Sequence, residues 1–421
     1  MSNTDQGWNG MFRVGSTRLL CALVGVALVS TLAISQMLPT PAGAASGARP
    51  VVTGGGASRA SRDVSLVAVP AGPAPAARQP LRVPPSVSAN AAWILSAQHA
   101  DGAIPNYVND AHLSPYLGNQ AAQGLARASV VTQNAAFATA AWRWLTWYQA
   151  HEGAQGFVTD YVLSGATFVS TGDMDSTDAY AGTFLSAASA TWAAAPDQSR
   201  LLALRSGIVN AVGAIEATQD TDGLTWAKPT WHVKYLMDQG EAYAGLKAVA
   251  PLAAALGDAA LAARASADAS RMSAAVAQLW NPAEGAFSWA VYDSGVRQST
   301  NWSALYPDAM EQAWAVAYGL ASPAQAKAIT GHLLAAQPAW DRPLAPASVA
   351  GSSQPAGYWP VAGWALDNVG RINAASLAMT SIQTAADSTN RAWPFTPATA
   401  GGLIILATGG PAVAGLFGSP V

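Results

Sequence analysis

Three glutamines, Gln219, Gln278 and Gln337, follow one another at a constant spacing of 59 residues. The turns after two helical stretches are nearly the same, Gln98-His-Ala-Asp-Gly102 and Gln219-Asp-Thr-Asp-Gly223, and a looser version runs from Gln278 to Gly285. A period of this length fits one long loop, a helix, a tight turn and a second helix. Such helix pairs bury their apolar faces by stacking or by closing into a ring, which places all the long loops on one face.

Apolar residues at helical spacing dominate the chain, whereas alternating strand patterns are scarce. Hydrophobic residues make up 51% of the sequence, enough for a large core. We therefore expect an all-α domain. The predicted helices are ten in number and cover residues 88–98, 130–151, 176–195, 198–219, 232–255, 259–280, 302–320, 323–337, 360–384 and 397–406. A long loop is predicted up to about residue 126, and a short β-hairpin or irregular loop over residues 152–174.

The N-terminal segment carries an export signal. Arg13 and Arg18 precede an apolar run over residues 19–38, and Ala42-Gly43-Ala44 has the form of a signal-peptidase site. The run is also long enough to span a bilayer, so residues 1–44 are either a signal peptide or a signal-anchor. Residues 45–85 are rich in Ala, Pro and Gly, typical of a disordered linker. We expect a domain over residues 86–421, secreted or in the cell envelope, whose only membrane contact is this N-terminal segment if it is not cleaved.

Several classes of function are excluded by what the sequence contains. The net charge of −3 provides no basic surface for nucleic acid. The single cysteine, Cys21, lies in the apolar N-terminal run, so a disulfide framework or a cysteine-ligated metal is excluded. The five histidines show no metal-ligand spacing, and no phosphate-binding loop or dinucleotide fingerprint is present. We expect no metal and no cofactor.

Three carboxylates, Asp173, Asp175 and Asp178, lie within six residues at the start of the predicted helix 176–195, and Tyr180 follows them. In a chain that is only 11% charged, this grouping is unusual. Helix N-termini favour negative charge, so capping explains part of the pattern. Acids beside an aromatic residue on the long-loop face also fit a functional site.

Other predicted helices on the same face begin with aromatic and acidic residues together. Aromatic rings pack on the C–H faces of a sugar, and carboxylates bind its hydroxyls. Glycoside cleavage further requires two carboxyl groups. The residues concerned are Trp226, Trp231, His232, Tyr235, Asp238, Glu241, Trp302, Asp308, Glu311, Trp359 and Trp364.

Structural explanations compete with this reading. Asp238 and Glu241 could pair with Lys234 and Lys247 on the same helix. Asp308 and Glu311 could be acids that interact with a helix dipole. Asp101 and Asp222, in the Asp-Gly turns, are expected to serve the turns themselves.

The repeated helix pairs, the Gln-x-x-Asp-Gly turns, DSTDAYAGTFL at Asp175–Leu185 and KYLMDQGEAYAGL at Lys234–Leu246 resemble the six-hairpin glycosidase superfamily. The resemblance covers about residues 86–410. It implies an (α/α)6 toroid with a carbohydrate cleft at the N-terminal ends of helices, lined by acids and aromatic residues. Ten predicted helices leave the sixth hairpin open.

We therefore expect an exported glycoside hydrolase that acts on a poly- or oligosaccharide. Its catalytic pair is expected among Asp175, Asp178, Asp238 and Glu241, with Glu241 as general acid and Asp175 as base. The residues expected to bind substrate are Asp173, Tyr180, Trp226, Trp231, His232, Tyr235, Trp302, Asp308, Glu311, Trp359 and Trp364. Two alternatives stay open: a non-catalytic carbohydrate-binding protein of the envelope, and a lyase or epimerase that would use Lys228, Lys234 or Arg371 to bind a uronate carboxylate.

Overall fold

The computed structural model describes residues 86–341 and 357–410. The predicted signal segment, residues 1–44, and the predicted linker, residues 45–85, lie outside the described residues and stay predictions. The described part contains twelve α-helices, which complete six pairs. Their bounds are α2 (Ser86–Ala97), α3 (Pro115–Thr132), α4 (Ala135–Ala150), α5 (Thr177–Ala194), α6 (Gln198–Thr218), α7 (Leu236–Leu256), α8 (Ala259–Ala277), α9 (Met310–Ala317), α10 (Pro323–Ala336), α11 (Pro360–Asn368), α12 (Ile372–Ser388) and α13 (Pro397–Ala407).

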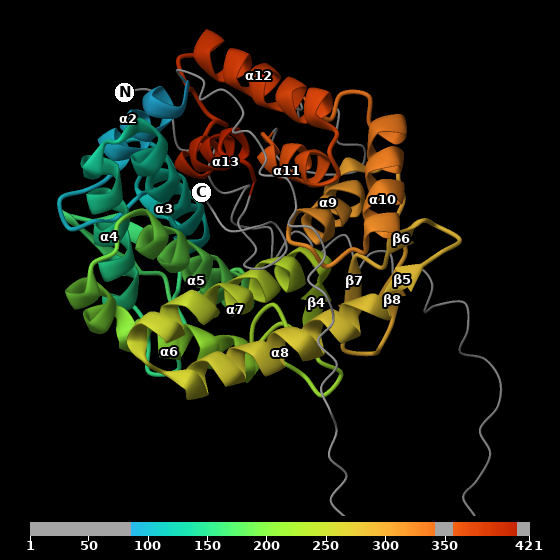
Figure 1. Ribbon diagram of the computed structural model, residues 1–421, viewed down its shortest axis with the longest axis horizontal. Helices are drawn as coiled ribbons and strands as arrows, with labels where there is room; N and C mark the ends of the chain where they lie inside the picture. Colours follow the sequence, from blue (N-terminus) through green and yellow to red (C-terminus); the bar gives the residue numbers. More distant parts are fainter. Residues whose placement is uncertain (1–85, 342–356, 411–421) are drawn as a thin grey trace, which may run out of the picture. The chain divides into compact units, whose positions relative to one another are not determined.

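The helices form two concentric layers (Figure 1). The inner layer is a closed ring in which α3, α5, α7, α9, α11 and α13 each pack against the next, and α13 packs back on α3. The helices that alternate with them along the chain, α2, α4, α6, α8, α10 and α12, pack around the outside. This is the predicted (α/α)6 toroid. The hydrophobic core lies between and within the layers, and its large buried side chains include Trp144, Tyr148 and Phe184.

The long connections lie before the inner helices, as the repeat predicts. They carry the short strands: β1 (His112–Leu113) precedes α3, and the hairpin β2 (Tyr161–Ser164) and β3 (Thr167–Ser170) precedes α5. The strand β4 (Val233–Tyr235) leads into α7 and pairs with β7 (Ala290–Tyr292), which pairs with β8 (Arg297–Gln298). The strands β5 (Trp280–Asn281) and β6 (Ala286–Phe287) form a further ladder. The predicted hairpin within residues 152–174 is confirmed.

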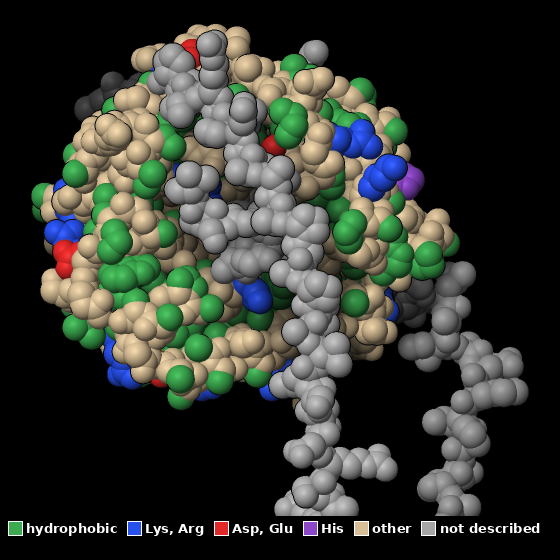
Figure 2. Space-filling model, viewed as in Figure 1, with side chains coloured by type: hydrophobic (Ala, Val, Ile, Leu, Met, Phe, Trp, Pro, Cys, Tyr) green, Lys and Arg blue, Asp and Glu red, His purple; other side chains and the backbone are tan. Residues whose placement is uncertain are grey.

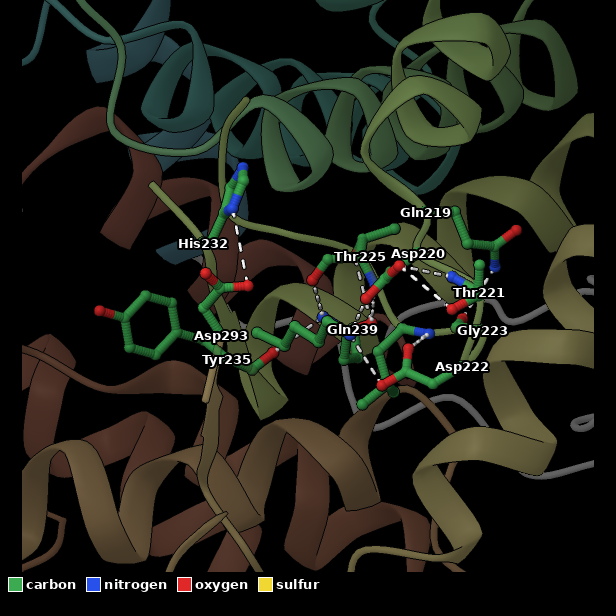
Figure 3. Close-up of polar contacts among 12 residues, drawn as sticks. Gln219, Asp220, Thr221, Asp222, Gly223, Thr225, His232, Tyr235, Gln239 and Asp293 are labelled. Atoms are coloured by element: carbon green, nitrogen blue, oxygen red, sulfur yellow. Dashed lines mark hydrogen bonds and ion pairs between the residues drawn. The ribbon is translucent and has the colours of Figure 1, made fainter. Parts of the chain in front are cut away.

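The similar turns in the sequence also have similar structures. The side-chain amides of Gln98 and Gln219 donate to the carbonyls of Gly102 and Gly223, each at 2.9 Å. Asp101 and Asp222 accept the backbone N–H two residues further on, at 3.0 Å in both turns, which confirms that they serve the turns. Gly102 and Gly223 have φ values of +106° and +92°, a backbone conformation that favours glycine. Figure 3 shows the second of these turns.

Several predicted helix boundaries were wrong. The predicted helix 302–320 is α-helical only over α9, with a π-helical stretch (Leu305–Ala309) before it. The predicted loop up to residue 126 contains most of α3, and the chain breaks at Gln133, whose φ is +54°, inside the predicted helix 130–151. The predicted helix 360–384 is two helices, α11 and α12, separated at Gly370 with φ +76°. The helices α3 and α12 supply the two that were missing from the predicted count.

Candidate active site

Glu241 lies in the second turn of the inner helix α7 and is almost completely buried, with 1% of its surface exposed. Its Oε1 atom accepts two hydrogen bonds, from the Tyr116 hydroxyl at 2.6 Å and from the Trp314 indole N–H at 2.8 Å. Its Oε2 atom is buried and has no hydrogen-bond partner among the described residues. Burial raises the pKa of Glu241 to about 8, although the two donors act in the opposite direction. Burial therefore favours the protonated form of Glu241.

Asp178 and Asp238 connect the beginnings of α5 and α7. The Ser176 hydroxyl lies 2.6 Å from Oδ1 of Asp178 and 3.2 Å from Oδ2 of Asp238. Ser176 is the N-cap of α5, but its side chain bridges these two acids and does not cap the helix. Asp178 also accepts the Thr225 hydroxyl at 2.5 Å, and burial raises its pKa to about 6. Both acids are buried, and Ser176 connects them between the beginnings of two inner helices.

The loop between β3 and α5 carries Asp173 and Asp175. Asp173 is exposed and forms an ion pair with Lys228 at 2.8 Å, which helps to lower its pKa. Asp175 is partly exposed, whereas the side chain of Tyr180, five residues later in the sequence, is buried. The Tyr180 hydroxyl donates to Oδ1 of Asp160 at 2.7 Å. Burial raises the pKa of Asp160 to about 7.

Aromatic rings gather around Glu241 from other inner helices. Trp314, from α9, contacts Trp359 edge to face with 6.1 Å between the ring centroids. Trp359 stacks on Tyr306 at 5.1 Å, and it is partly exposed. These rings are flat apolar faces, which can pack on a sugar ring, and Trp314 connects them to the Glu241 carboxyl group.

The other predicted aromatic residues contact neighbours of their own. Trp226 stacks on the exposed His232 at 4.9 Å, and the Trp231 indole N–H donates to the Tyr235 hydroxyl at 3.3 Å, next to β4. Trp302 stacks on His332 of the outer helix α10 at 5.0 Å. Trp364 is buried and donates to the Gly402 carbonyl at 2.9 Å, so it packs α11 against α13.

The competing structural explanations have mixed outcomes. Lys234 is buried and pairs with Asp220 and Asp222, each at 2.7 Å. It lies in β4, so the expectation that it shares a helix with Asp238 and Glu241 was wrong. Glu311 is buried and accepts the Met237 N–H at the start of α7, at 3.3 Å. Asp308 accepts the Asn301 N–H at 2.7 Å. Glu311 thus contacts a free N–H group at the N-terminal end of α7, whereas the Asp308 contact lies in the loop before its helix and does not test the helix-dipole interpretation.

Three residues of this region were missed as site residues. Tyr116 was assigned to a loop, although it follows Pro115 at the start of α3, a position that marks helix beginnings. Trp314 lies near the beginning of an inner helix together with the acids Asp308 and Glu311. This combination of an aromatic residue with acids is visible in the sequence and could have identified it. Asp160 precedes β2 as a single acid in a loop, and nothing in its sequence neighbourhood distinguishes it.

The described residues provide little charge for other kinds of ligand. Uncharged side chains predominate on the face shown in Figure 2, with Lys and Arg scattered both near its edge and toward its middle. Within residues 86–341 and 357–410, no group of three or more His, Asp or Glu side chains is arranged to hold a metal ion.

Comparison with known proteins establishes the fold. No protein-family model matches the sequence, and the search of curated proteins found no match. A wild-type glycosidase structure matches with a TM-score of 0.55 and 18% identity over 76% of this chain and 95% of that one. A GH63 mannosylglycerate hydrolase from Thermus thermophilus, in complex with glucose, matches with a TM-score of 0.57 and 11% identity over 77% and 99%. A rhamnosidase from Klebsiella oxytoca with rhamnose bound matches with a TM-score of 0.54 and 14% identity over 78% and 64%. The chain therefore has the (α/α)6 fold of six-hairpin glycosidases.

Proposed function

We propose that the protein is a glycoside hydrolase that acts on a poly- or oligosaccharide, with Glu241 as general acid and Asp175 as base. The observation that carries this proposal is the environment of Glu241. Both donors, Tyr116 and Trp314, point at Oε1, so the proton of the neutral acid resides on Oε2. A general acid must hold its proton at the working pH, and the raised pKa of Glu241 meets that condition.

Asp175 is proposed as base because it is the partly exposed acid of the loop that leads into α5. A base in an inverting enzyme must contact water on the face of the sugar opposite the acid. Glu241 is covered in the structure, and substrate binding must expose its Oε2 atom before that atom reaches a glycosidic oxygen. Catalytic contacts often form only when substrate is bound.

The surroundings of the lysines argue against a lyase or epimerase. Lys234 is buried between two carboxylates, and Lys228 pairs with Asp173. Both ammonium groups already have carboxylate partners, which leaves Arg371 as the third candidate to bind a uronate carboxylate. For the location, we propose export through the N-terminal segment, which fits an enzyme that meets polysaccharide outside the cell.

The test is incubation of the purified protein with a panel of polysaccharides, in which new reducing ends and the ultraviolet absorbance of unsaturated uronates are both measured. We expect reducing ends without absorbance. Glu241→Gln and Asp175→Asn should each lower turnover by at least about 100-fold, the usual scale of general acid–base catalysis. Glu216→Gln is the matched control, because Glu216 pairs with Arg264 between the outer helices α6 and α8.

Each other outcome identifies an alternative. Absorbance would indicate a lyase. Sugar binding without any product would favour the non-catalytic carbohydrate-binding protein. Full activity of either site variant would remove that residue from the proposed pair.

A further inference from the structure

Backbone hydrogen bonds connect the loop that carries Asp175 to Asp160, the residue before β2. The backbone N–H of Asp160 donates to the Asp173 carbonyl, and the N–H of Thr171 donates to the Asp160 carbonyl, each at 2.8 Å. The Asp160 side chain faces the same region, because it accepts the Tyr180 hydroxyl. Asp160 thus contacts both the loop before α5 and the first turns of that helix.

Tyr180 is the centre of a small hydrogen-bond network. Only 2% of its surface is exposed. Its hydroxyl contacts Oδ1 of Asp160 at 2.7 Å, Oγ of Ser114 at 3.1 Å and the backbone N of Asp175 at 3.4 Å. A phenol has one proton to donate. Tyr180 donates it to Asp160, and therefore Ser114 and the Asp175 N–H are the donors in the other two contacts.

This network joins three segments that lie far apart in the sequence. Ser114 precedes α3, Asp160 precedes β2, and Asp175 precedes α5. Ser114 is itself held, since its backbone N–H donates to the Asn106 side chain at 2.6 Å. A hydrogen-bond network in which every member is bonded holds its groups in one arrangement. The hydroxyl of Tyr180 is the atom that these contacts share.

We propose that Tyr180 is a positioning residue for Asp175, and that Asp160 and Ser114 orient the Tyr180 hydroxyl for this purpose. The proposal rests on the proposed function for its catalytic consequence, because Asp175 is the proposed base. It replaces the predicted role of Tyr180 in binding substrate. It also gives Asp160 a role, as the acceptor that fixes the direction of the Tyr180 O–H bond.

The test compares two Tyr→Phe variants that each remove one buried hydroxyl. Tyr180→Phe removes the shared hydroxyl. Tyr148→Phe is the matched control, because the Tyr148 hydroxyl is buried without a hydrogen-bond partner among the described residues and its ring stacks on Phe184. We expect backbone hydrogen exchange over residues 171–176 to become at least about tenfold faster in Tyr180→Phe, as for the loss of one hydrogen bond, and to stay unchanged in Tyr148→Phe.

Kinetics on the polysaccharide that the wild-type protein cleaves give the second measurement. A misplaced base lowers kcat with little change in KM, so we expect kcat of Tyr180→Phe to fall at least about tenfold with KM within about threefold. Asp160→Asn keeps an acceptor for Tyr180 and should retain more activity than Asp160→Ala, which has none.

The two measurements separate failure of the proposal from failure of the proposed function. Unchanged exchange over residues 171–176 in Tyr180→Phe would overturn the proposal, whatever the activity. Faster exchange with unchanged kcat would also overturn it, because the loop would then be held without effect on catalysis. If the wild-type protein cleaves no polysaccharide but exchange is faster in Tyr180→Phe, the positioning of Asp175 is supported. Only the proposed function is then overturned.

Discussion

The indole N–H of Trp314 donates to Oε1 of Glu241, from one inner helix to the next, at 2.8 Å. The two residues occupy equivalent positions in successive helix pairs, because each lies two residues after a glutamine with the same role. Gln239 bonds both backbone groups of Thr225, and Gln312 bonds both backbone groups of Phe287, in the loops that precede their helices. Figure 3 shows Gln239 beside Thr225. The repeat therefore brings equivalent positions of neighbouring inner helices into contact. Of these two positions, only that of Glu241 holds an acid.

The first prediction concerns the other donor to Glu241. Tyr116→Phe removes the hydroxyl that lies 2.6 Å from Oε1. A donor to a carboxylate stabilises its charged form, so this change should raise the pKa of Glu241 further. If Glu241 is the general acid, the alkaline limb of the kcat/KM profile should move up by about one pH unit, the scale of one hydrogen bond to a charged group. Tyr148→Phe should leave that limb in place, and an unmoved limb in Tyr116→Phe would remove Glu241 as the acid.

The second prediction concerns stability as a function of pH. The pKa of Glu241 is about 8 in the folded protein, against an ordinary value of 4.5. The folded state thus binds the proton more tightly than the unfolded state. The stability that this difference provides is present below about pH 4.5 and is lost as the pH rises to about 8. Glu241→Gln should be close to the wild type in stability at low pH and more stable above pH 8, by an amount on the order of a few kcal/mol.

Denaturant unfolding between pH 5 and pH 9 checks this prediction. The quantity to compare is the difference in the free energy of unfolding between variant and wild type. The difference should grow with pH for Glu241→Gln. It should stay within about 1 kcal/mol at all pH values for Glu216→Gln, which loses one exposed ion pair. A difference for Glu241→Gln that does not change with pH would mean that Glu241 is ionised in the folded protein.

Much of the fold could be predicted because its signals are local. The Gln-x-x-Asp-Gly turns show in the sequence because Gln98 and Gln219 each bond within five residues, and the glycines there have positive φ. By contrast, α3 was missed because its helical state depends on distant packing. It contains Gly118, a poor helix former, at the place where the Trp144 ring of α4 packs. Tertiary contact selected a glycine there, against local propensity.

The candidate site could be predicted only in part, for a similar reason. Glu241 and the acids near Asp175 stand out as acids beside aromatic residues in a chain with little charge. The pKa of Glu241 depends on Tyr116 and Trp314, which lie 125 and 73 residues away in the sequence. The role of Asp160 depends on a hydroxyl 20 residues later. Sequence patterns identify the residue types, but which residues meet is decided by the closure of the ring.

The last prediction concerns the contact between α5 and α7 beside the site. A Cβ atom at Gly182 would lie 2.5 Å from the backbone carbonyl oxygen of Glu241, so Gly182→Ala forces the two inner helices apart. The contacting atoms on both helices belong to the backbone, so no flexible side chain can move aside. We therefore expect a loss of about 1–3 kcal/mol in the free energy of unfolding. Gly213, on the outer helix α6, has nothing within 4 Å of the same added atom. Gly213→Ala should therefore stabilise the protein by about 0.5–1 kcal/mol through helix propensity.

The pair of alanine variants separates close packing from helix propensity, because both make the same chemical change within a helix. Moving α7 away from α5 also moves Glu241 relative to Asp175, so Gly182→Ala should lower kcat more than its loss of stability explains. Denaturant unfolding and kinetics at a temperature where both variants are fully folded measure the two effects. Equal stability of the two variants would show that α5 and α7 do not meet as closely as the Gly182 contact requires.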